Sequence, residues 1–125
     1  MRQIEQDIVN AIRFGVSFVS GTSSSYMPNT IGYRDNLTFE KNTFSYKLWG
    51  NEIAKGDTAA REITVSDCGY PTATTTSRLN ALFAGLDIPM AVSVRKKKIV
   101  YSIHGQEVQP GTMHYYAGDW KVTVR

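Results

Sequence analysis

The residues of this sequence that carry nucleophilic or proton-transfer chemistry are few. Cys68 is the only cysteine and follows Asp67, and the two histidines, His104 and His114, lie much further along the chain. A thiol nucleophile needs a base within hydrogen-bond reach, and nothing in this spacing brings the side chains together. Paired ligands typical of zinc sites and glycine-rich phosphate-binding motifs are absent from the sequence. We therefore predict a protein that is not an enzyme and needs neither a metal nor a cofactor.

The strongest charge feature is a run of four adjacent cations, Arg95, Lys96, Lys97 and Lys98. Residues 1–85 carry equal numbers of acidic and basic side chains, so the excess that gives the net charge of +3 lies entirely after them. Such a run at a hairpin tip can contact phosphates, or it can keep an exposed turn soluble and block edge pairing. Nucleic acid is therefore one candidate partner.

Aromatic and polar side chains form a second set of candidate binding residues. Trp49 and Tyr70 lie at predicted turns or strand ends, and exposed residues of these two types are favoured in protein interfaces. His104, in the second predicted hairpin, is a further candidate binding residue. Arg78 and Asn80 lie on the flank of a predicted helix, where they could tether the loop at residues 69–70 or meet a ligand. A protein is therefore a second candidate partner.

Two segments have the apolar stripe of an amphipathic helix. In residues 2–14, isoleucines recur every four positions, and Gly15 follows as a stop. In the second segment, leucines and a phenylalanine recur at helical spacing behind a run of threonines that can cap a helix. We predict a short helix at about residues 75–84, and we expect Gly85 to end it in a left-handed conformation.

Strands are predicted on both sides of the second helix, because apolar and polar residues alternate there. Gly50–Asn51 is expected to form a two-residue hairpin turn, and the basic run is expected to form another. The predicted strands are 37–49, 52–55, 63–65, 90–94, 99–103 and 120–124.

Residues 46–56 are similar to residues 101–111. At this offset of 55 positions, four residues are identical and three more are exchanged for similar ones. Hairpins share a common pattern of alternation and glycine turns. The similarity therefore indicates either two related β-meanders or two unrelated hairpins of one kind.

Length and composition are those of a globular protein. The chain has 125 residues, of which 42% are hydrophobic and 20% charged, so we expect a single domain spanning residues 1–125. A secretory signal and a membrane-spanning run are absent from the sequence, and a single cysteine fits a reducing cytoplasm. The predicted fold class is α+β: an antiparallel sheet of two β-meanders, with an N-terminal helix and a short central helix packed on it.

Three segments resemble a widespread group of small bacteriophage proteins. They are Tyr46–Ala54, Ser66–Tyr70 and Thr74–Leu82, which read YKLWGNEIA, SDCGY and TTTSRLNAL. Members typically show a leucine-x-glycine-asparagine hairpin, a glycine-aromatic-x-threonine step, a TT-x-x-RLNA helix and a second aromatic hairpin. Trp49 replaces the usual histidine before the hairpin glycine, and His104 holds the equivalent place in the second hairpin. The resemblance implies a phage origin and this fold, and it implies no activity.

Phage proteins of this size commonly act by binding a host or nucleic-acid target, which is an expectation for the class. We therefore expect a non-enzymatic phage accessory protein in the host cytoplasm that binds, and modulates or inhibits, a host protein such as a defence or transcription component. The alternative is a nucleic-acid-binding module that uses Arg95–Lys98. Homo-oligomer formation is open in both interpretations, and neither involves a membrane.

Overall fold

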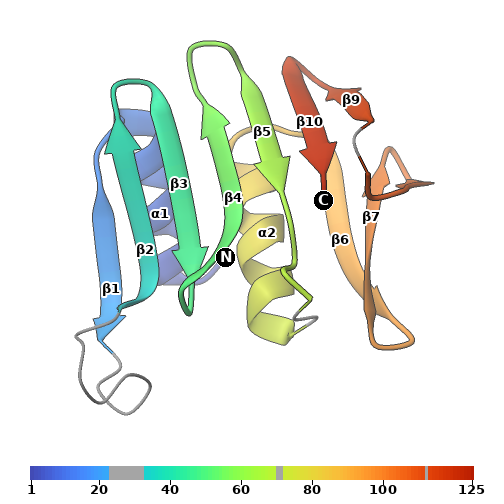
Figure 1. Ribbon diagram of the computed structural model, residues 1–125, viewed down its shortest axis with the longest axis horizontal. Coiled ribbons are helices and arrows are strands. Elements are labelled where there is room, and N and C mark those ends of the chain that lie inside the picture. The colour runs from blue at the N-terminus through green and yellow to red at the C-terminus, as the bar shows by residue number, and fades with distance from the viewer. Residues whose placement is uncertain (23–32, 70–71, 112) are drawn as a thin grey trace.

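The computed structural model describes residues 1–22, 33–69, 72–111 and 113–125, and it confirms the predicted α+β class. Both helices lie behind a large sheet in Figure 1, and a small sheet lies beside them. The helices are α1 (Gln3–Phe14) and α2 (Ala73–Gly85). The large sheet has the order β1 (Phe18–Thr22), β2 (Tyr33–Glu40), β3 (Thr43–Leu48), β4 (Asn51–Asp57), β5 (Glu62–Val65), β10 (Trp120–Val124), β9 (His114–Ala117). The small sheet has the order β6 (Met90–Arg95), β7 (Lys98–Ile103), β8 (Gln106–Val108).

The N-terminal helix and its stop are confirmed. The Arg2 N–H donates to Glu5 Oε1 at 3.1 Å, which satisfies one of the free amides at the start of α1. Gly15 ends the helix with φ +69, and its N–H reaches the carbonyls of Ala11 and Ile12. This left-handed conformation carries no Cβ penalty in glycine.

The central helix begins two residues before its predicted start. Thr72 caps it, since the Thr75 N–H donates to Thr72 Oγ1 at 3.1 Å. The prediction for Gly85 is wrong: Gly85 is the last helical residue and does not adopt a left-handed conformation. Its lack of a side chain serves packing instead, because an added Cβ would lie 2.3 Å from a γ carbon of Val9 in α1.

The two β-meanders correspond closely. β3 and β7 span equivalent residues at the offset of 55, and their registers agree, since Leu37 pairs with Tyr46 as Val92 pairs with Tyr101. The turn after β3 is shifted by one residue from the prediction, because Asn51 already begins β4. Trp49 and Gly50 form it with φ +53 and +80, and the residues after β7 repeat these angles at +51 and +80. Positive φ at both positions is the type I′ pattern that suits strand twist.

The meanders occupy separate sheets, with one parallel pair that the sequence pattern did not predict. β10 runs parallel to β5, and Val122 and Val124 pair there with Ile63 and Val65. All four side chains are buried, so this pairing lets both strands face the core that lies between the large sheet and the helices. No helix in the described part of the chain is long and apolar enough to cross a membrane.

Candidate functional site

A cluster of charged side chains lies in the interior between both helices and the large sheet. Arg78 of α2 contacts Glu5 of α1 through Nη1 at 2.9 Å and Asp35 of β2 through Nε at 2.9 Å. The hydroxyl of Tyr46 donates to Asp35 Oδ1 at 2.5 Å, and Ser77 Oγ donates to Glu5 Oε2 at 2.5 Å. At most 3% of the surface of each of the three charged side chains is exposed.

Both carboxyl groups of this cluster stay ionised because of their hydrogen bonds. Burial by itself raises the pKa of Asp35, but donors on Arg78, Tyr46 and Arg34, together with the charge of Arg78, hold it below its usual value. The pKa of Glu5 is lowered in the same way, against burial, by Ser77, the Arg2 amide and Arg78. Burial raises the pKa of the Tyr46 hydroxyl, and the hydrogen bond to Asp35 and the charge of Asp35 raise it further.

The structure therefore gives Arg78 and Asn80 partners within the fold. Arg78 joins α1, α2 and β2, and its binding role stays a prediction. Asn80 Nδ2 donates to the Val92 carbonyl at 2.9 Å, and the Val92 N–H donates to Asn80 Oδ1 at 2.8 Å. The amide of Asn80 thus hydrogen-bonds the edge of β6 as a neighbouring strand would.

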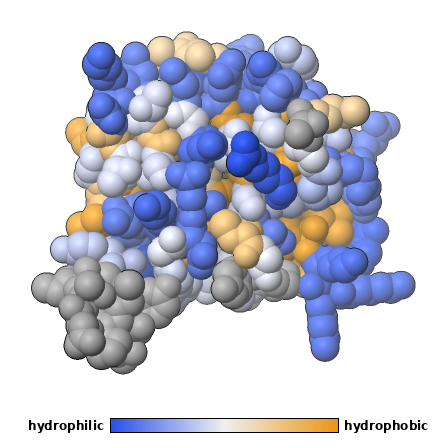
Figure 2. Space-filling model, viewed as in Figure 1, coloured by the Kyte–Doolittle hydropathy of each residue, from blue (hydrophilic) through white to orange (hydrophobic). Residues whose placement is uncertain are grey.

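The basic run forms the turn between β6 and β7, as predicted. Lys96 and Lys97 occupy the turn with φ +51 and +61, and all four cations are exposed. Arg95 lies 3.6 Å from Glu107, and this pair is open to solvent. Long hydrophilic side chains project at the lower right of Figure 2, where Figure 1 places this turn.

A hollow of about 300 Å³ opens beside the turn between β3 and β4, and we call it the Trp49 hollow. Trp49 stands at its rim, with 39% of its surface exposed. The hollow is bounded by β3, β4, the segment after β5 and the start of α2, through Leu48, Trp49, Asn51, Ile53, Asp67, Thr72 and Thr75.

Two of the eight described residues other than glycine that have a positive φ lie at or beside this hollow. Trp49 has φ +53 and Cys68 has φ +54, a left-handed conformation that is unusual for any residue with a side chain as large as that of tryptophan. The Cys68 thiol donates to the Glu52 carbonyl at 3.1 Å, and its N–H donates to Ser66 Oγ at 3.0 Å. Strained residues of this kind cluster at binding sites, where the surrounding structure holds them.

The predicted binding residues are divided between two ends of the fold. The turns that follow β3 and β6 both lie at the lower end in Figure 1, which places Trp49 and the basic run on that end. His104 lies at the other end of β7 from the basic run, because that strand separates their turns. Tyr70 lies outside the described residues.

Sequence reasoning missed the hollow. Asp67, Ile53, Thr72 and Thr75 lie in separate segments of the sequence, and no sequence signal links them. The one feature of the sequence that could have indicated the hollow is Trp49, a bulky residue before the hairpin glycine, where a turn prefers asparagine or aspartate.

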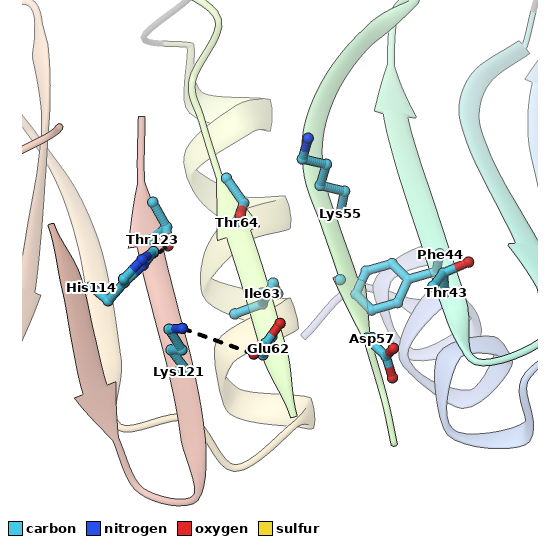
Figure 3. A pocket seen from close by; sticks show the side chains of 11 residues that line it. Thr43, Phe44, Lys55, Asp57, Glu62, Ile63, Thr64, His114, Lys121 and Thr123 are labelled. Atoms are coloured by element: carbon cyan, nitrogen blue, oxygen red, sulfur yellow. Dashed lines mark hydrogen bonds and ion pairs between the residues drawn. The ribbon is translucent and has the colours of Figure 1, made fainter. Parts of the chain in front are cut away.

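A second, broader groove of about 440 Å³ lies on the outer face of the large sheet (Figure 3). Its side chains interact mainly with one another: Lys121 Nζ lies 3.9 Å from Glu62, and His114 Nδ1 lies 2.7 Å from Thr123 Oγ1. Lys55 and Asp57 add one charge of each sign. This mixture is typical of the solvated face of a sheet.

Among the described residues, no group of three or more His, Cys, Asp or Glu side chains is arranged to hold a metal ion. The model of one protein family, described as Kyanoviridae Gp96 protein, matches residues 1–122 of the chain. No curated protein and no solved structure matches it.

Proposed function

Since the chain belongs to the Kyanoviridae Gp96 protein family, a family of phage proteins, we propose that it is a non-enzymatic accessory protein that binds and modulates a host protein in the host cytoplasm. A component of host defence or transcription is the target class that we propose. The observation that carries this proposal is Trp49, a large aromatic side chain held in a strained turn at the rim of a hollow.

The position of Trp49 suits a contact with another protein. A left-handed conformation costs roughly 1–2 kcal/mol in a residue with a side chain, which asparagine and glycine largely avoid. Trp49 keeps 39% of its surface exposed in this turn, so part of its aromatic side chain is available to a partner. Tryptophan is among the residues that contribute most to binding when they border a pocket, because they bury a large area with few rotatable bonds.

Trp49→Asn is expected to abolish capture of the host partner while the protein stays folded. Asparagine accepts the turn conformation, which by about 1 kcal/mol offsets part of the stability lost with the buried portion of the indole. The measurement is affinity capture of a stoichiometric partner from host lysate, followed by the dissociation constant with the purified partner and by urea unfolding of each variant.

The chain supplies a matched control in His104→Asn. His104 has φ +51 in the equivalent turn of the second meander, so the same substitution changes the same backbone position away from the Trp49 hollow. Partner capture by His104→Asn should equal that of the unmodified protein. Equal capture by both variants, or no stoichiometric partner at all, would contradict the proposed function.

A second candidate function is nucleic-acid binding by the β6–β7 turn, and the exposure of its four cations favours it. Adjacent cations that reach into solvent can contact successive phosphates, and binding of this kind depends strongly on salt. The turn is separate in the sequence from the residues around the Trp49 hollow, so variants can test the two functions independently.

Replacing Lys96, Lys97 and Lys98 together with glutamine should weaken oligonucleotide binding at low salt by at least about tenfold and reduce the salt dependence. Fluorescence anisotropy across a salt series measures both. The control replaces Lys41, Lys47 and Lys55 with glutamine. These three lysines are also exposed, and replacing them removes the same amount of charge from another part of the surface. Equal weakening by both sets would indicate a general charge effect, and absent binding at low salt would dispose of this function.

A further inference from the structure

The Trp49 hollow combines an apolar interior with one carboxylate. Leu48 and Ile53 line it, and each has only 2% of its surface exposed, so the wall they form is part of the hydrophobic core. Trp49 supplies an aromatic surface at the rim, and Asp67 is half-buried in the lining. Such a site suits a long aliphatic chain that ends in a polar group.

Asp67 has no cationic partner among the described residues. Its Oδ1 accepts the Gly69 N–H at 3.1 Å, and no ion pair involves it. The buried carboxylates Glu5 and Asp35 each contact Arg78 instead. A half-buried carboxylate is stabilised by an opposite charge, so Asp67 favours a ligand that brings a cation.

An anion fits this hollow poorly, although the start of α2 borders it. Two amides of the first turn are already engaged, since the Thr75 N–H donates to Thr72 Oγ1 and the Thr76 N–H donates to the Thr72 carbonyl. An anion would also face the carboxylate of Asp67. The negative charge of Asp67 therefore favours a positively charged ligand over an anion.

We propose that the Trp49 hollow receives the side chain of one arginine or lysine from a protein partner. The aliphatic stem lies against Leu48 and Ile53, the cationic head contacts Asp67, and the indole of Trp49 adds a cation–π contact. This assignment rests on the proposed function, because it names the chemistry by which the hollow would recognise a partner.

The test is a titration of the full-length, ¹⁵N-labelled protein with three capped tripeptides, Ala-X-Ala, in which X is arginine, norleucine or glutamate. We expect the arginine peptide to shift the Trp49 indole signal and the amide signals of Asn51 and Thr75, and to bind about tenfold more tightly than the norleucine peptide. Asp67→Asn keeps the oxygen that accepts the Gly69 N–H, and it should reduce arginine binding to the norleucine level.

The norleucine peptide matches the apolar stem and lacks the charge, so equal binding of norleucine and arginine would overturn the proposal. Preferential binding of glutamate, or no arginine-dependent shift at these signals, would overturn it as well. The titration needs no host partner. Partner capture that depends on Trp49 without arginine binding would therefore refute this inference alone, and the reverse result would refute the proposed function alone.

Discussion

Arg78→Leu is expected to lower the free energy of unfolding by about 3–5 kcal/mol, the largest effect of any single substitution that we propose. Leucine fills much of the same volume but leaves the carboxylates of Glu5 and Asp35 in the interior without their shared cation. Removing one partner of a buried ion pair costs far more than the pair contributes, because the remaining charge stays desolvated. Urea unfolding at neutral pH measures this loss.

Arg34→Leu is the matched control for Arg78→Leu. Arg34 also contacts Asp35, through Nε at 2.6 Å, but a third of its side chain is exposed to solvent. Water can replace much of this contact, so the expected loss is about 0.5–1 kcal/mol. Similar losses in both variants would show that burial is not what makes Arg78 important.

The pH dependence of unfolding separates a charge effect from lost packing. In the unmodified protein the folded-state pKa of Asp35 and that of Glu5 are lowered, so their stabilisation is complete above about pH 5 and is lost as the pH falls through the folded-state values. In Arg78→Leu, burial dominates and the carboxyl groups gain stability on protonation. The difference between the two proteins should therefore shrink toward acid pH, and a constant difference would indicate packing alone.

Gly85→Ala is expected to lower the free energy of unfolding by about 2 kcal/mol, although alanine is the better helix former by nearly 1 kcal/mol. The new Cβ would lie 2.3 and 2.5 Å from the γ carbons of Val9 and 2.9 Å from its Cβ. The third contact is with the rigid base of the side chain, so a rotamer change cannot relieve it, and α1 must move away from α2.

The double variant Val9→Ala, Gly85→Ala tests this cause directly. Val9 is 1% exposed, and truncating it alone leaves a small cavity that destabilises the protein. In the double variant the two methyl-sized changes compensate, so its loss should be smaller than the sum of the single losses by at least about 1 kcal/mol. Simple additivity in urea unfolding would contradict steric contact between the two positions.

The sequence predicts the elements of this fold better than their arrangement. Periodicity locates both helices and most strands of the two meanders, because each element buries one face. The predicted strand 37–49 is an exception, since it forms two antiparallel strands, β2 and β3, with a turn at residues 41–42 between them. The offset between residues 46–56 and 101–111 carries over to strand bounds and register. The glycine in the hairpin turn is located correctly, but its partner in the turn is Trp49 rather than the residue after it.

What the sequence did not predict depends on contacts between distant residues. Periodicity cannot show that Arg78 would find Glu5 and Asp35, because their pairing follows from how α1, α2 and β2 pack. The same applies to Gly85, whose neighbours lie in α1 and whose local sequence is typical of a helix end. The Trp49 hollow arises where four segments meet, so no single segment could have revealed it.

The parallel pairing of β10 with β5 has a consequence for how the chain folds. β2, β3, β4 and β5 pair with neighbours a few residues away and can form early, whereas residues 120–124 must find residues 62–65 after α2 and the second meander have been placed. Closing so long a stretch of chain is slow, because its entropy is lost before the contact is made. We therefore expect the insertion of β10 to limit the folding rate, with the inner edge of β5 exposed until then.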